Sequence, residues 1–246
     1  MVPGVDGGVV PHVLRTTTTV LRQMPEQAEA VALTTRSGVQ GSVRALINTE
    51  GVVLVTGGGP AEVFVGNGSN ELIELIVKTF VLEGEEVLTS AQTFIAYKLA
   101  AQAHGKTLVE APMKGRFHYD LDALKKLMSR RTKVVFLANP DNPTGSTFPE
   151  GDLVTFLDGV PKETLVVLDE AYQEFVDGGG YQDSLALRKK YTNLVVLRTF
   201  SKIHGLAGLR LGYGVAREEL VEYLDRVRAP FNVNLVAQAA GVAALS

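Results

Sequence analysis

The sequence contains no cysteine in its 246 residues. This absence excludes disulfide bonds, thiolate metal sites and a cysteine nucleophile within it, and it is typical of proteins of the reducing cytoplasm. Only four histidines are present, and they are scattered without the spacing of metal ligands. We therefore expect no metal site.

Long apolar runs and basic clusters are also lacking. No apolar run reaches the roughly 20 residues that span a membrane, and the N-terminus lacks the charged start and compact apolar region of a secretory signal. The net charge is −3 with no long basic run, so neither nucleic acid nor an anionic membrane is an expected partner. These absences predict a cytoplasmic protein.

The composition is that of an ordinary globular protein, with 46% hydrophobic and 21% charged residues. Hydrophobic periodicity is weak in residues 1–60, where we predict only a short helix at 25–33 and a strand at 52–55. The run of three glycines and a proline at 57–60 lacks the lysine and Ser/Thr of a phosphate loop. We treat 1–60 as an atypical N-terminal region of unassigned fold and 61–246 as the main domain.

From residue 61 onward, β-branched runs alternate with amphipathic stretches. The runs predict strands at 63–65, 87–88, 107–111, 134–138, 165–168, 194–197 and 209–215. The amphipathic stretches predict helices at 72–80, 94–104, 120–129, 151–157, 218–227 and 234–245, with Ser69 or Asn70 capping the first. The alternation predicts an α/β fold, a three-layer αβα sandwich around a mostly parallel sheet.

Ligands of such sheets lie at the carboxyl ends of the strands, so polar residues there are candidates for a site. Ser69 and Asn70 follow the first strand at a helix N-terminus, which is either an anion site or a plain helix cap. Asn142 lies in a loop with two Asn-Pro pairs. Such a rigid loop either aims an amide at a ligand or simply makes a tight turn.

Asp169 directly follows four apolar strand residues and is therefore expected to be buried. A buried carboxylate is costly unless it meets a cation. A protonated pyridine nitrogen would be such a cation, and Tyr172 would then be within reach of a neighbouring ring oxygen.

The stretch 195–210 runs from an apolar strand through Thr199, Ser201 and Lys202 to a glycine-rich segment and Arg210. A buried lysine with lowered proton affinity would suit Schiff-base formation with an aldehyde, and the hydroxyls and arginine would suit a phosphate. The alternative is a strand end with a snorkelling lysine and a structural arginine. Taken together, the strand ends offer the groups that proteins supply to pyridoxal phosphate.

Four motifs in this order, NPDNPTG, VVLDEAYQEF, RTFSKIHGLAGLRLGY and APFNVN, resemble those of the fold type I aminotransferases. Within them the chain most resembles histidinol-phosphate aminotransferases, from about Val63 to the last residue. The resemblance implies that Lys202 binds the cofactor covalently, that Asp169 pairs with the ring nitrogen, and that Tyr172 and Asn142 contact the ring hydroxyl.

The same resemblance implies further contacts to pyridoxal 5′-phosphate. Phe94 occupies the place of the aromatic residue that stacks on the pyridine ring, and Asn232 matches a motif near the site to which we assign no role. The implied phosphate contacts are Ser69, Asn70, Thr199 or Ser201, and Arg210.

The implied function is amino transfer between L-glutamate and 2-oxoglutarate on one side and histidinol phosphate and imidazole acetol phosphate on the other, in a homodimer. The family's tyrosine that reaches the partner's cofactor is missing from residues 1–60, and the sequence ends before the family's small C-terminal domain. What remains resembles the large cofactor domain alone.

Other functions stay open at this point. Within the same chemistry they are an aromatic aminotransferase and a threonine-phosphate decarboxylase. From another class, the chain would be a catalytically inactive fragment that binds the cofactor. A dinucleotide-binding domain is excluded because no GxGxxG with a downstream acidic residue is present.

Overall fold

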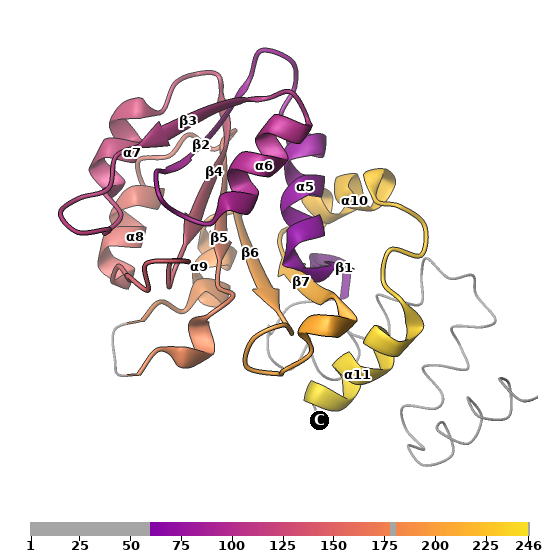
Figure 1. Ribbon diagram of the computed structural model, residues 1–246. Helices are drawn as coiled ribbons and strands as arrows, with labels where there is room; N and C mark the ends of the chain where they lie inside the picture. The colour runs from indigo at the N-terminus through magenta and orange to yellow at the C-terminus, as the bar shows by residue number, and fades with distance from the viewer. Residues whose placement is uncertain (1–59, 178–180, 246) are drawn as a thin grey trace, which may run out of the picture.

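The computed structural model describes residues 60–177 and 181–245, so the helix predicted at 25–33 and the strand at 52–55 lie outside the described residues. Within them, seven strands form one sheet in the order β1-β7-β6-β5-β4-β2-β3 (Figure 1). The strands are β1 Val63–Asn67, β2 Glu86–Ser90, β3 Thr107–Ala111, β4 Thr132–Ala138, β5 Leu165–Asp169, β6 Leu194–Thr199 and β7 Leu211–Val215.

The sheet is mostly parallel, as predicted. β3, β2, β4, β5 and β6 run parallel to one another, β7 is antiparallel to β6, and β1 is antiparallel to β7. Ala138 pairs with Asp169, and Asp169 pairs with Leu197. The carboxyl ends of the three central strands therefore meet at one edge of the sheet.

Helices cover both faces of the sheet and make the predicted three-layer sandwich (Figure 1). The helices on one face are α5 Gly68–Phe80, α6 Ile95–Ala103 and α10 Glu218–Val227, and those on the other are α7 Leu121–Leu127, α8 Glu150–Leu157 and α9 Ser184–Lys190. α11 Leu235–Leu245 packs beside β7. Short 3-10 turns lie at Pro60–Glu62, Gln173–Phe175 and Ala207–Leu209.

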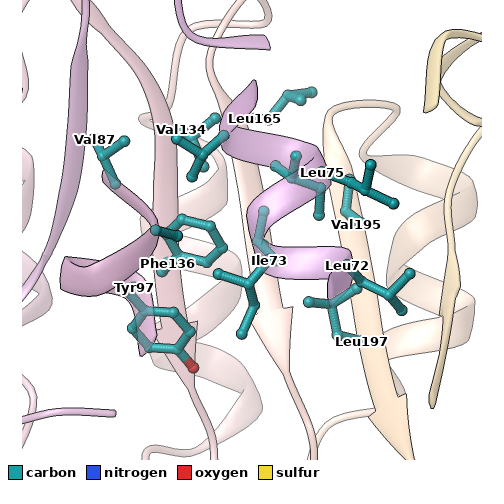
Figure 2. Packing of buried hydrophobic residues seen from close by; sticks show 14 of the residues in the cluster. Leu72, Ile73, Leu75, Val87, Tyr97, Val134, Phe136, Leu165, Val195 and Leu197 are labelled. Carbon is teal, nitrogen blue, oxygen red and sulfur yellow. The ribbon is translucent and has the colours of Figure 1, made fainter. Parts of the chain in front are cut away.

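The central strands are apolar along their whole length because both of their faces are covered. Successive side chains point to opposite faces. Val134 and Phe136 of β4 therefore pack against α5 and α6 (Figure 2), whereas Val135 and Leu137 pack against α7 and α8. All four are 0% exposed, and each such side chain contributes about 1.5–3 kcal/mol on burial.

The predicted strands and helices between 63 and 245 are all present within a few residues of their expected bounds. The sequence does not predict α9, because its leucines, Leu185 and Leu187, are two positions apart and do not show a helical period. Its N-terminus is nevertheless marked by Asp183, whose side chain accepts a hydrogen bond from the backbone of Ala186.

The predicted cap of α5 is wrong. The helix begins at Gly68, so Ser69 and Asn70 lie in its first turn and Asn67 takes the cap position without a side-chain hydrogen bond. Glu71 instead closes this turn, accepting a hydrogen bond of 2.6 Å from the backbone N–H of Asn67. None of the helices in the described part of the chain is long and apolar enough to cross a membrane.

Candidate active site

A cavity of about 230 Å³ lies at the edge of the sheet where the central strands end. Residues from the β1–α5 turn, from α6 and from the loops after β4, β5 and β6 line it. All ten residues for which the sequence predicts a cofactor contact lie in its lining: Ser69, Asn70, Phe94, Asn142, Asp169, Tyr172, Thr199, Ser201, Lys202 and Arg210. The strand register therefore gathers residues from 69 to 210 into one pocket, while their roles in binding remain predictions.

Asp169, the last residue of β5, is 4% exposed. Its Oδ2 accepts a hydrogen bond of 3.0 Å from Tyr97 Oη, and its Oδ1 accepts one of 3.1 Å from the backbone of Ala171. Burial raises the pKa of Asp169 to about 6, and the two hydrogen bonds oppose this rise. No lysine or arginine among the described residues forms a salt bridge with it, so the carboxylate suits a cationic N–H donor held in the pocket.

Tyr97 also lines the pocket, and the sequence analysis did not single it out. Its ring is 0% exposed and stacks on Phe136 with the ring centroids 4.6 Å apart (Figure 2). Burial and the nearby Asp169 raise the pKa of the Tyr97 hydroxyl, which keeps it protonated as a donor. Its position three residues after Phe94 places both rings on one side of α6, and this spacing is the signal that could have found it.

Lys202 is exposed, so the expectation of a buried lysine is wrong. The buried side chain at the end of β6 is that of Phe200, which is 0% exposed, and the chain has left the sheet by residue 202. Lys202 Nζ lies 4.9 Å from the centroid of the Tyr172 ring, a distance typical of a cation–π contact. The amine therefore reaches the pocket from its open side, next to Tyr172.

Two glycines bring Arg210 against the start of α5. Gly68 has a φ of +76°, and a Cβ there would lie 2.5 Å from Arg210 Nη2. A Cβ on Gly212 would lie 2.3 Å from the backbone nitrogen of Ser69. Arg210 itself is in the left-handed region with a φ of 60°, a conformation costly for a residue with a side chain and found most often at functional sites.

This arrangement places a guanidinium beside the positive end of a helix of 13 residues. Arg210 donates to the carbonyl of Ala207 at 3.0 Å but has no carboxylate partner in the described part of the chain. The Thr199 and Ser201 hydroxyls, 3.0 Å apart, lie in the same lining. An arginine, free helix amides and hydroxyl groups together fit a phosphate monoester.

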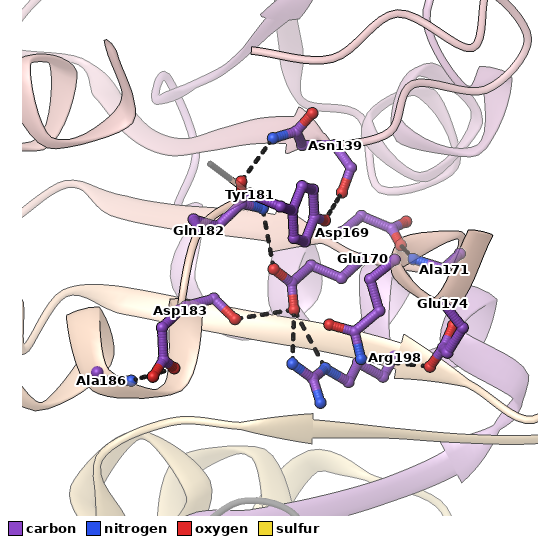
Figure 3. A network of polar contacts seen from close by, with 12 residues as sticks. Asn139, Asp169, Glu170, Ala171, Glu174, Tyr181, Gln182, Asp183, Ala186 and Arg198 are labelled. Atoms are coloured by element: carbon purple, nitrogen blue, oxygen red, sulfur yellow. Dashed lines mark hydrogen bonds and ion pairs between the residues drawn. The ribbon is translucent and has the colours of Figure 1, made fainter. Parts of the chain in front are cut away.

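Asn142 has a half-buried side chain in the same lining, with no hydrogen bond to another described residue. Its loop is fixed by Asn139, which is 0% exposed. Asn139 Nδ2 donates to the Phe148 carbonyl at 2.9 Å. It also donates to Gln182 Oε1 at 2.7 Å (Figure 3). The loop therefore places the Asn142 side chain in the lining of the cavity.

A buried ion pair links β6 to Glu170, the residue that directly follows β5 (Figure 3). Arg198 of β6 donates to Glu170 Oε2 through Nε at 3.1 Å and through Nη2 at 3.0 Å. Gln182 and Ser184 also donate to Glu170. Burial raises the pKa of Glu170, and the Arg198 charge opposes the rise. The sequence analysis gave neither residue of the pair a role.

Asn232 has a structural role outside the pocket lining. Its Nδ2 donates to the Val65 carbonyl at 3.1 Å and to Glu71 Oε2 at 2.9 Å, and its Oδ1 accepts from Arg228 Nη1 at 2.9 Å. The side chain therefore ties the segment after α10 to the β1–α5 turn, from which Ser69 and Asn70 face the cavity.

A family model described as aminotransferase class I and II matches residues 40–246. The histidinol-phosphate aminotransferase of Anaeromyxobacter sp. (strain Fw109-5) is 78% identical over 186 residues, which cover 76% of this chain and 51% of that protein. The histidinol-phosphate aminotransferase of Moorella thermoacetica is 47% identical over 182 residues, covering 74% of this chain and 47% of that protein. The chain thus spans about half the length of the curated relatives it matches.

Solved structures share the fold. The crystal structure of histidinol-phosphate aminotransferase from Sinorhizobium meliloti in complex with pyridoxal-5′-phosphate matches with a TM-score of 0.75 and 30% identity. The match covers 90% of this chain and 60% of that one.

Proposed function

This chain belongs to the aminotransferase class I and II family, whose members depend on pyridoxal phosphate, and we propose that it holds this cofactor in the pocket around Lys202. We propose further that it acts in amino transfer between L-glutamate and histidinol phosphate, with 2-oxoglutarate and imidazole acetol phosphate as their keto counterparts. The 78% identity to a histidinol-phosphate aminotransferase is the observation that carries this choice of substrates. It favours them over the aromatic amino acids and threonine phosphate.

The residues of the pocket fit the cofactor at both of its ends. The start of α5 and Arg210 form a positively charged cradle for the phosphate. Gly68 and Gly212 leave room for it, because a Cβ at either position would collide with Arg210 or Ser69. Asp169 is a buried carboxylate that forms no salt bridge with a described lysine or arginine, which leaves it available to a pyridine nitrogen. Phe94 would stack on the ring, Asn142 and Tyr172 would bind its hydroxyl, and Lys202 would bind its aldehyde carbon.

The bound cofactor supplies a conjugated ring that accepts the electrons of a carbanion at the substrate α-carbon. The other tasks belong to the protein. Lys202, on the open side of the pocket, would hold the cofactor through its amine and would carry a proton to and from the substrate α-carbon. Asp169 would keep a proton on the ring nitrogen, and Tyr97 holds the Asp169 carboxylate in place.

We assign cofactor binding to residues 61–246 and leave 1–60 as a separate region. A homodimer is part of the same proposal, since the resemblance implies that the partner subunit completes each site.

A substrate comparison tests the proposed reaction. Protein loaded with pyridoxal phosphate is mixed with histidinol phosphate and 2-oxoglutarate, and glutamate formation is followed against the same mixture with phenylalanine or threonine phosphate. We expect glutamate from histidinol phosphate at the highest kcat/KM. Cofactor binding at Lys202 without amino transfer, and without release of carbon dioxide from threonine phosphate, would instead identify the chain as an inactive cofactor-binding fragment.

A further inference from the structure

Asp141 is a buried carboxylate that the proposed chemistry does not use. Its side chain is 3% exposed and forms no salt bridge within the described part of the chain. Thr93 Oγ1 donates to its Oδ1 at 2.5 Å, and Thr144 Oγ1 donates to its Oδ2 at 2.7 Å. Because burying a charge costs free energy, a carboxylate held by two hydroxyls instead of a cation needs an explanation.

The hydrogen bonds that end at Asp141 have a fixed direction. The backbone N–H of Ala138 donates to Tyr119 Oη at 3.1 Å, so Tyr119 uses its own proton elsewhere. Thr93 gives its only hydroxyl proton to Asp141, so it accepts from Tyr119 at 2.7 Å. The hydrogen bonds therefore run from Ala138 to Tyr119, from Tyr119 to Thr93 and from Thr93 to Asp141. Each donor in this series has one acceptor.

This series of hydrogen bonds joins two loops that reach the pocket from different elements. Thr93 directly precedes Phe94, and Asp141 directly precedes Asn142. Both following residues line the cavity. The first donor of the series is the backbone N–H of Ala138, the residue that pairs with Asp169 in the sheet. One buried carboxylate thus connects the loop before α6, the loop after β4 and the end of the central strands.

Asp141 also closes its own loop. Its backbone N–H donates to the Ser146 carbonyl at 2.9 Å, and its carbonyl accepts from Gly145 N–H at 2.9 Å. With the Thr144 contact to the carboxylate, the loop has a shape of its own that does not depend on Thr93. The Thr93 contact is therefore the link that sets where this loop lies relative to Phe94.

We propose that Asp141 is a positioning residue that, through Thr93, fixes the separation between Phe94 and Asn142 and thereby prepares the pocket for the pyridine ring. This inference rests on the proposed cofactor site. A carboxylate suits the task because each of its oxygens accepts a hydroxyl proton, whereas an asparagine would present an amide donor to one of them. A pocket already held in its binding conformation binds more tightly, because less conformational freedom is lost on binding.

The test is cofactor affinity in the full 246-residue chain. Thr93→Val keeps the shape of the side chain and removes only the hydroxyl that links Asp141 to Tyr119. We expect its Kd for pyridoxal phosphate, from titration of the visible absorbance, to rise about tenfold, the equivalent of about 1.4 kcal/mol. The visible circular dichroism of the bound cofactor should fall with it, and Thr93→Ser should restore both.

Thr164→Val is the matched control. Thr164 is 1% exposed and donates to the Thr132 carbonyl at 2.9 Å, at the end of β5 away from the cavity. We expect it to lower the thermal midpoint of the cofactor-free protein by as much as Thr93→Val does, with an unchanged Kd.

Three outcomes would overturn the inference: an equal Kd for Thr93→Val and wild type, an equal rise in Thr164→Val, or no rescue by serine. Wild-type protein that binds no cofactor would overturn the proposed function and this inference together. Binding that is normal in wild type and unaffected in Thr93→Val would overturn the inference alone.

Discussion

The Tyr97 hydroxyl donates a hydrogen bond of 3.0 Å to Oδ2 of Asp169, although the two residues are 72 positions apart in the sequence. Tyr97 lies on α6 and Asp169 ends β5, so a helix above the sheet orients a carboxylate in the sheet. The phenol acts against the burial that raises the pKa of Asp169 to about 6. It thereby favours the ionised carboxylate, which a protonated ring nitrogen requires.

We expect Tyr97→Phe to raise the pKa of Asp169 further while keeping the ring stacked on Phe136. The pH at which cofactor affinity falls to half should then move upward, because Asp169 must lose its proton to pair with the ring nitrogen. Titrations with pyridoxal phosphate between about pH 5 and 9 would measure this midpoint. A variant whose midpoint matches that of wild type would show that Tyr97 does not influence Asp169.

Asp169→Asn should change the stability of the cofactor-free protein in a pH-dependent way. Burial raises the pKa of Asp169 in the folded protein from 3.8 to about 6. The contribution of this carboxyl group to the free energy of unfolding is therefore fully present below pH 4 and is lost as the pH rises through 6. The free energy of unfolding of the variant, relative to wild type, should therefore rise by up to about 3 kcal/mol between pH 4 and pH 8.

Urea unfolding of both proteins at the two pH values measures this difference. Cofactor affinity of Asp169→Asn should fall at the same time, because the amide offers no charge to the ring nitrogen. A stability difference that stays constant with pH would contradict the assigned pKa shift.

Gly212→Ala should damage the phosphate cradle. The new Cβ would lie 2.3 Å from the backbone nitrogen of Ser69, so β7 and the start of α5 must separate. Overpacking of this kind costs about 1–3 kcal/mol, and we expect weaker binding of both pyridoxal phosphate and inorganic phosphate. Gly208→Ala is the control, because a Cβ there would have no neighbour within 4 Å. Equal phosphate affinity in the two variants would argue against a cradle at this turn.

Arg198→Met should be among the most damaging single changes away from the cavity. It leaves the Glu170 carboxylate buried without its ion-pair partner, which costs about 3–5 kcal/mol. Thermal unfolding should show a large loss for the single variant and a partial recovery when Glu170→Gln is added. Similar stability of the single and double variants would mean that the two charges are not coupled.

The sequence predicts the three layers of this fold well, because strands and helices are marked by hydrophobic patterns within a few neighbouring residues. Strands such as β5 read as short apolar runs, and both of their faces prove to be covered by helices. The sequence does not show the helix α9, because Leu185 and Leu187 are two positions apart and not three or four. Asn67 takes the cap position of α5 because the helix begins at Gly68, and its backbone N–H donates to Glu71, a contact that the sequence of the turn does not show.

The motifs placed ten residues at the cavity, but the contacts that set their properties were beyond prediction. The bonds from Tyr97 to Asp169 and from Thr93 to Asp141 join segments 72 and 48 positions apart, so they depend on the completed sheet. The sequence also predicts a buried Lys202, because an apolar run precedes it. In the structure Lys202 is exposed, because β6 ends at Thr199 and the chain then leaves the sheet.

Covalent labelling tests the assignment of Lys202 most directly. Pyridoxal phosphate is added to the protein, the visible absorbance is recorded, the adduct is reduced with borohydride, and the labelled peptide is identified by mass spectrometry. We predict one phosphopyridoxyl group per chain, on Lys202, and no label in Lys202→Ala. A label spread over several surface lysines, or a single label on another lysine, would contradict it.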